Sequence, residues 1–221
     1  NEGGGDAVWQ RLLSQKPDDL DVHWRYAIWL FANGKGDAAK AHRTALAGKA
    51  SDRARALEML SGIQLQMLQN EEAKATLASL EKEFPGDPST QLAAARLASI
   101  EGRYADAAPL LRAFVGKREN AEAFRLLALS ELYLGNLPAA VAAVDRSIAL
   151  SSGPQVETLA LKARILHASR DWPLAVQTYT QVLQTGATLP PRDLVLFASA
   201  LYEANRPIGA RQVLEGILAL P

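Results

Sequence analysis

The sequence predicts an all-α solenoid of about six helix pairs that follow a single leading helix. Two observations predict this fold class: amphipathic segments recur as helix–turn–helix pairs, and two sets of small residues repeat at a common interval. The composition agrees, because 221 residues with 48% hydrophobic and 22% charged side chains are typical of a folded chain. A solenoid needs no single large core, since each repeat buries its apolar face on its neighbours.

The clearest pair of helices spans residues 121–154. Phe124, Leu127 and Ala128 share one face of its first helix at helical spacing. Gly135 follows and ends that helix, because a C-terminal turn favours a residue that reaches positive φ cheaply. Asn136 is the expected N-cap of the second helix. The other segments of the chain vary this pattern.

Two sets of small residues measure the repeat. The first helices carry Ala27, Ser61, Ala95, Ala128, Ala163 and Ala198. The second helices carry Ala39, Ala73, Ala107, Ala140, Ala175 and Ala210. In both sets the successive spacings are 34, 34, 33, 35 and 35 residues. Small side chains at these positions would let the two helices of each pair pack closely.

A helix–turn–helix period near 34 residues is the signature of tetratricopeptide repeats. The chain resembles this family over nearly its whole length, and the residues that carry the resemblance are Leu127-Ala128, Gly135-Asn136, Ala140 and Val144. The resemblance implies a right-handed solenoid and a scaffold protein of the bacterial tetratricopeptide type. The resemblance does not predict an activity, because the family is defined by packing positions.

The turn residues depart from the family pattern in half of the repeats. The turn glycine is present at Gly34, Gly102 and Gly135. Leu68, Arg170 and Asn205 stand near that position in the other repeats. We expect the turn Gln69-Asn70-Glu71-Glu72 of the second repeat to be one residue short.

We divide the chain into a half repeat and six full repeats. The half repeat covers 1–19, and the full repeats cover 20–53, 54–87, 88–120, 121–155, 156–190 and 191–221. Within the half repeat, the Gly-rich stretch 1–6 is expected to be flexible and 7–15 to form one helix. The last helix is apolar and lacks a polar cap, so we expect further sequence or a second copy of the chain to cover it.

Candidate binding residues follow from the resemblance, which implies that the first helices line a concave groove. We expect the residues that packing within each repeat leaves free to bind a partner: Trp24, Ile28, Phe31, Arg96, Arg125, Leu129, Tyr133, Arg164, His167 and Tyr202. An apolar, aromatic surface with three arginines suits an amphipathic helix or an extended peptide with carboxylates, because arginine binds a carboxylate with two hydrogen bonds. The alternative is that these side chains pack on neighbouring repeats or that the arginines are solvated.

The sequence offers no catalytic or cofactor motif. The absence of cysteine excludes disulfides and thiolate chemistry. His23, His42 and His167 are far apart, with no further ligand at metal-binding spacing, so we expect no metal, no cofactor and no enzyme activity. The formal net charge is zero with interspersed charges, which disfavours nucleic-acid binding. No apolar run approaches the ~18–20 residues of a membrane span.

We therefore predict a non-catalytic protein–protein interaction scaffold that binds a peptide or helix in its groove. By analogy we assign it to bacterial cell-envelope assembly, such as exopolysaccharide secretion, pilus assembly or cytochrome maturation, and favour the periplasm over the cytoplasm. One alternative is a regulatory or substrate-binding segment of a larger enzyme. Another is a self-assembling scaffold that forms a homo-oligomer through its C-terminal helix.

Overall fold

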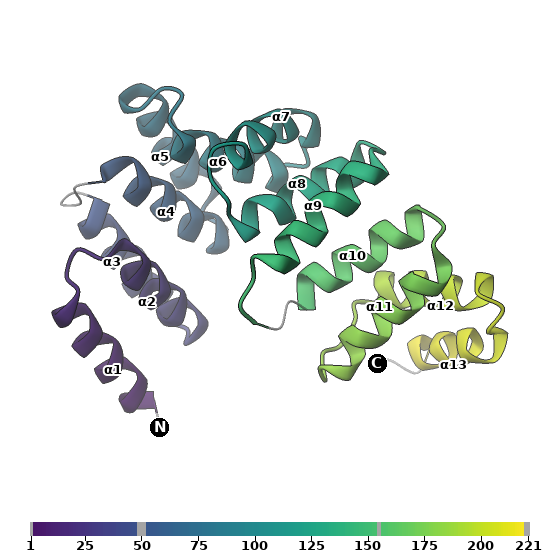
Figure 1. The fold of residues 1–221 in the computed structure, drawn as a ribbon. Helices are drawn as coiled ribbons and strands as arrows, with labels where there is room; N and C mark the ends of the chain where they lie inside the picture. Colours follow the sequence, from purple (N-terminus) through teal and green to yellow (C-terminus); the bar gives the residue numbers. More distant parts are fainter. Residues whose placement is uncertain (1, 48–51, 154–155, 219–221) are drawn as a thin grey trace. The chain divides into compact units, whose positions relative to one another are not determined.

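The structure, a computed structural model, describes residues 2–47, 52–153 and 156–218. Over these residues the chain forms thirteen α-helices, most of which pack as consecutive antiparallel neighbours (Figure 1). Their bounds are α1 Glu2–Gln15, α2 Leu20–Ala32, α3 Gly36–Ala47, α4 Arg53–Gln66, α5 Asn70–Glu83, α6 Pro88–Ile100, α7 Tyr104–Val115, α8 Ala121–Tyr133, α9 Leu137–Ala149, α10 Val156–Ala168, α11 Trp172–Gln184, α12 Pro191–Glu203 and α13 Pro207–Leu218. The all-α class and the paired helices confirm the prediction from the sequence.

The chain divides into two compact units, Asn1–Glu101 and Gly102–Pro221, which we call unit 1 and unit 2. In unit 1, α2 packs on α3 and α4 on α5, while the first helices α2, α4 and α6 are neighbours. In unit 2, the pairs are α8 with α9, α10 with α11 and α12 with α13, and α8, α10 and α12 are neighbours. Each unit is therefore two layers of helices with an apolar core between them.

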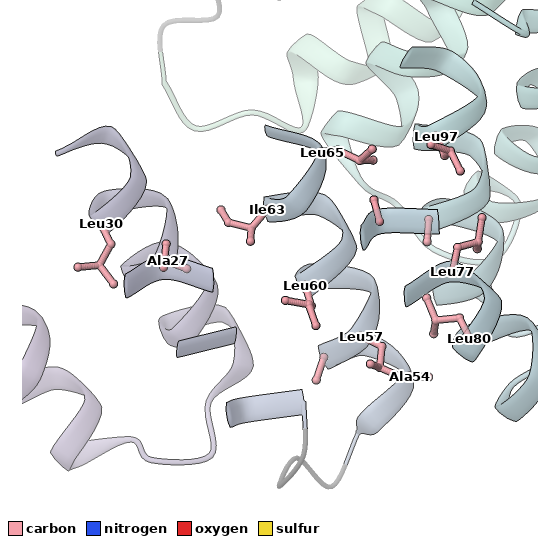
Figure 2. Close-up of a cluster of buried hydrophobic side chains, with 14 of the residues drawn as sticks. Ala27, Leu30, Ala54, Leu57, Leu60, Ile63, Leu65, Leu77, Leu80 and Leu97 are labelled. Carbon is pink, nitrogen blue, oxygen red and sulfur yellow. The ribbon is translucent and has the colours of Figure 1, made fainter. Parts of the chain in front are cut away.

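The core of unit 1 gathers side chains from α2, α4, α5 and α6 (Figure 2). Leu30, Leu60, Ile63 and Leu80 are each at most 6% exposed. In unit 2, the core of the last two pairs is built around Tyr179, Val182 and Phe197 together with smaller side chains. Burial of these side chains removes apolar surface from water and is the main stabilising contribution.

Both sets of small residues lie in the packed interior, as the sequence predicts. The six first-helix positions are at most 2% exposed, and the six second-helix positions are at most 5% exposed. A side chain that ends at Cβ lets two helix axes approach without opening a void. The small residues that repeat along the chain therefore occupy the positions that set the distance between helices.

The Gly-rich start of the chain differs from the sequence prediction, because α1 already begins at Glu2. A Cβ atom added at Gly5 would lie 2.7 Å from the Trp29 ring of α2. Glycine at this position thus allows α1 to lie directly on the tryptophan. The helix was expected to begin at residue 7, and that boundary was wrong.

The turns within the pairs share one geometry whether or not they contain glycine. Three residues separate α4 from α5, at 67–69, as they separate α2 from α3, at 33–35, so the turn before Glu71 is not one residue short. The middle residue has positive φ in both kinds of turn, with 73° at Gly34, 78° at Gly135 and 58° at Leu68. Arg170 and Asn205 adopt the same conformation, with φ of 60° and 59°.

Asn136 stands at the N-cap position of α9, as the sequence predicts, but its side chain does not cap the helix. Its side chain makes no capping hydrogen bond, and its Nδ2 donates instead to Glu131 Oε2 at 2.8 Å. Glu131 is 1% exposed, and its other oxygen accepts from Arg112 Nη2 at 2.6 Å. The side chain of Asn136 therefore helps to satisfy a buried carboxylate.

No helix in the described part of the chain is both long enough and apolar enough to cross a membrane.

The turn geometry predicts that Leu68→Gly stabilises unit 1. A left-handed conformation costs a residue with a Cβ about 1–2 kcal/mol, against about 0.5–1 kcal/mol of extra chain entropy for glycine. Leu68 is 85% exposed, so its removal forfeits little packing. We expect a higher urea midpoint for Leu68→Gly and a lower one for the reverse control Gly135→Ala, whose Cβ would meet nothing within 4 Å. A lower midpoint for Leu68→Gly would contradict this account.

Candidate functional site

Unit 2 contains a cavity of about 440 Å³ on the side of its first helices. We call it the unit 2 cavity. Its lining residues come from α8, α10, the segment before α12 and the starts of α7 and α12: Tyr104, Arg125, Leu129, Tyr133, Val156, Glu157, Ala160, Leu161, Arg164, Thr188, Leu189, Pro190 and Asp193. Four of the ten binding residues expected from the sequence, Arg125, Leu129, Tyr133 and Arg164, thus lie around one cavity.

Helix α8 supplies three of these four residues from a single stripe. Arg125, Leu129 and Tyr133 are spaced four residues apart, which places them on one face of the helix. The opposite face carries Leu126 and Leu127, which are at most 8% exposed and belong to the interior. The amphipathic pattern of α8 therefore fixes which residues reach the cavity.

One wall of the cavity is a pair of stacked tyrosines. The rings of Tyr104 and Tyr133 are parallel within 2°, with centroids 4.2 Å apart. Arg192 Nη1 donates a hydrogen bond to the Tyr133 hydroxyl at 3.3 Å, and this bond lowers the pKa of Tyr133 below its usual value. Burial raises the pKa of Tyr104. The stack gives the cavity a flat aromatic surface beside a guanidinium.

The cavity also has a buried polar group whose hydrogen bonds are incomplete. Asp193 is 5% exposed, and its Oδ1 lies 3.6 Å from Arg164 Nε, beyond hydrogen-bond distance. Neither atom has a hydrogen-bond partner among the described residues, and the same holds for the buried hydroxyl of Tyr179. Burial, reinforced by the Asp193 carboxylate, raises the pKa of Tyr179 and keeps it neutral.

Arg125 is a charged residue of the cavity that forms no ion pair with any residue that the structure describes. Its side chain is half-buried. Three other arginines of unit 2 are paired, Arg112 with Glu131, Arg146 with Glu119 and Arg211 with Glu215. The cavity, which Glu157 also lines, therefore offers a guanidinium that no described residue holds in an ion pair.

His167 and Tyr202 lie elsewhere in unit 2. His167 Nε2 is 3.1 Å from Ser199 Oγ, its ring edge meets Trp172, and burial lowers its pKa. Tyr202 is 67% exposed and lines a second, apolar cavity of about 500 Å³ between α12 and α13. Leu214 and Leu218 line this second cavity, whereas the expected apolar residue Leu220 lies outside the described residues. Self-association through α13 stays a prediction, which light scattering over a range of concentrations tests.

In unit 1, Trp24 and Arg96 both pack beside Gly62. The guanidinium carbon of Arg43 lies 4.8 Å from the Trp24 ring centroid. A Cβ at Gly62 would come within 3.2 Å of Trp24 and 3.3 Å of Arg96, so glycine makes room for both. Arg96 is 7% exposed and forms an ion pair with the buried carboxylate of Glu58. Its charge is thus neutralised inside unit 1, as the packing alternative from the sequence anticipates.

The other two candidates of unit 1 lie on α2. Ile28 is 38% exposed. Phe31 is partly buried against the core cluster of Figure 2. Neither residue shows a polar partner that would mark a ligand site.

Two histidines that are distant in sequence form a contact in unit 1. His23 Nδ1 and His42 Nε2 are 2.9 Å apart, and the rings stack with centroids 4.9 Å apart. His23 Nε2 lies 2.7 Å from the Pro17 carbonyl oxygen, which fixes it as the protonated nitrogen. Within the described residues no group of three or more His, Cys, Asp or Glu side chains could hold a metal. This pair was not predicted from the sequence, because spacing along the chain does not bring His23 and His42 together.

Several cavity residues were also missed from the sequence. Tyr104 begins a second helix, whereas the expectation considered first helices alone. Asp193 lies in the first turn of α12, where an acidic residue is explained by the helix dipole and attracts no notice. The segment Thr188–Pro190 is a loop, so no periodicity predicts where it lies. Tyr104 becomes a candidate only when contacts between neighbouring helix pairs are considered.

Comparison with known proteins identifies the fold. No protein-family model matches the chain, and no curated protein sequence matches it. Among solved structures, it is similar to Cut9 in the APC/C hetero-tetramer Cut9–Hcn1, with a TM-score of 0.72 and 16% identity over 96% of this chain. It is also similar to PilF of Pseudomonas aeruginosa, with a TM-score of 0.64 and 18% identity over 87% of each chain. YrrB, described as a tetratricopeptide protein with an unusual peptide-binding site, matches with a TM-score of 0.60 and 13% identity over 79% of this chain and 89% of YrrB.

These similarities show that the chain has the tetratricopeptide-repeat fold expected from its period. The chain spans 42% of the length of the Cut9 chain that it matches.

The histidine pair predicts a pH dependence of stability. Burial, with the neighbouring charges of His23 and Arg43, lowers the pKa of His42 from 6.5 to about 4. Between these values the unfolded chain binds more protons, so the stability present above pH 6.5 is lost as the pH falls toward 4. We expect His42→Gln, which keeps a donor toward His23, to flatten this loss by at most about 1.4 kcal/mol per pH unit.

Thermal unfolding followed by tryptophan fluorescence between pH 7 and pH 5 checks this prediction, because Trp9, Trp24 and Trp29 report on unit 1. The difference between wild type and His42→Gln isolates the histidine from the carboxylates. Parallel curves for the two proteins would show that His42 is not buried in this way.

Proposed function

We propose that the chain is a non-catalytic scaffold and that the unit 2 cavity binds a segment of a partner protein. The observation that carries the proposal is Arg125, a half-buried charge without an ion pair to any described residue, which lies in a cavity beside the Tyr104–Tyr133 stack. Arginine and tyrosine are enriched among the residues that dominate the affinity of protein interfaces. The proposed binding residues are Arg125, Leu129, Tyr133 and Arg164 from the sequence, with Tyr104 added.

The charges around the cavity favour a protein partner over a nucleic acid. Glu157 and Asp193 line it together with Arg125 and Arg164, so its surface is mixed and not uniformly basic. Nucleic-acid binding needs several phosphate contacts from clustered cations. The fold supports the same proposal, because YrrB, which shares it, is described as having a peptide-binding site.

For the cellular setting we propose bacterial cell-envelope assembly, in the periplasm. The processes that we propose are exopolysaccharide secretion, pilus assembly or cytochrome maturation. The Ala-, Leu- and Arg-rich composition without cysteine supports a bacterial protein, and the absence of cysteine suits an oxidising compartment. The similarity in fold to a Pseudomonas aeruginosa protein over 87% of both chains is consistent with this setting.

The experiment is a cross-linked pull-down from a lysate of the source organism with three versions of the chain. Arg125→Glu combined with Tyr133→Ala disrupts the unit 2 cavity. Arg206→Glu combined with Ile208→Ala is the control, because it makes the same charge reversal and removes a large side chain at exposed positions outside both cavities. Circular dichroism verifies that all three are equally helical.

We expect a partner that wild type and control capture and that the cavity variant loses, and we expect it to be an envelope protein. A partner retained by the cavity variant would contradict the proposed binding surface. A cytoplasmic partner lost in the same way would support the surface and contradict the setting.

A further inference from the structure

We propose that the unit 2 cavity recognises its partner through an aspartate or glutamate side chain within a peptide segment whose neighbouring residues are apolar. This inference rests on the proposed function and adds the chemistry of the bound residue. Arg125 and Arg164 hold the carboxylate, and a backbone N–H of the segment donates to Asp193.

The need for an anion comes from the two arginines of the cavity. Arg125 has no ion pair to a described residue, and Arg164 Nε, which forms an ion pair with Asp193 Oδ1 at 3.6 Å, makes no hydrogen bond. Away from bulk water, a charge-assisted hydrogen bond to guanidinium is stronger than a neutral one. A carboxylate has two oxygens, so it can accept from both side chains at once.

The need for a nearby donor comes from Asp193. Its Oδ1 is buried without a hydrogen-bond partner among the described residues, and a buried acceptor left in that state is costly. A peptide residue with an acidic side chain supplies an acceptor group and a backbone N–H within a few bonds of each other. It can therefore meet both the arginines and Asp193.

Phosphate fits this site less well than a carboxylate. Glu157 and Asp193 line the same cavity, so a dianion would be placed beside two carboxylates. A phosphate dianion also offers Asp193 no hydrogen to accept. A single negative charge on a chain with amide donors satisfies both conditions.

The apolar lining argues for an acid within the chain and against a free C-terminus. Leu129 on α8, Val156 and Leu161 on α10, and Leu189 before α12 all line the cavity with the two arginines. The Tyr104–Tyr133 stack adds a flat aromatic wall. Apolar or aromatic surface thus comes from α7, α8, α10 and the segment before α12, which suits apolar residues on both sides of the acid.

The test selects short random peptides on the full chain from two phage libraries. One library fuses the peptide's C-terminus to the coat protein, and the other leaves it free. We expect the fused library to yield peptides with Asp or Glu between apolar residues. In fluorescence anisotropy, replacing that acid by Asn or Gln should weaken binding about 10- to 100-fold. Arg125→Leu should show a similar loss, and the control Arg206→Leu should bind as wild type does.

The outcomes separate this inference from the function on which it rests. Enriched peptides that lose binding to Tyr133→Ala but show no preference for an acid would overturn the inference and leave the proposed function standing. Enrichment from the free-terminus library alone would assign the carboxylate to a chain end and would also overturn it. If neither library yields a cavity-dependent peptide, the proposed function itself is contradicted.

Discussion

The close approach of paired helices at small residues is the constraint on which the rest of the structure depends. The positions typified by Ala128 and Ala140 are fully buried, and a larger side chain there would push the helices of a pair apart. Because the two sets recur together along the chain, each pair presents the same faces to the next. The faces of α8 and α10 that border the unit 2 cavity, and therefore the positions of Arg125 and Arg164, follow from this spacing.

The two units use charged residues of their first helices in opposite ways. In unit 1, Arg96 and Glu58 neutralise each other in the interior, and Gly62 leaves space for the side chains of Arg96 and Trp24. In unit 2, Arg125 lacks such a partner among the described residues and borders a cavity. A buried ion pair contributes to specific packing, whereas an unpaired guanidinium in a cavity is available for a ligand. The same type of residue on the same face thus has a structural role in one unit and a proposed binding role in the other.

Most of the fold could be predicted from the sequence, because small residues and turns recur at a measurable period. The left-handed turns at Leu68 and Arg170 were not predicted, since neither residue favours this conformation. The site was predicted in part: the stripe of α8 follows from helical spacing, but Tyr104, Asp193 and the histidine pair depend on contacts between elements. The glycine-rich start of α1 was missed because Gly5 lies against Trp29, a contact between helices that no local propensity reports.

Hydrogen–deuterium exchange of the chain alone and with its captured partner tests the central claim most directly, because it maps the contact without altering a residue. The account predicts slower exchange over Ala121–Tyr133 and over Val156–Ala168, the two helices that supply most of the lining of the cavity. Slower exchange confined to unit 1 or to α13 would contradict it and would place recognition on another surface of the molecule.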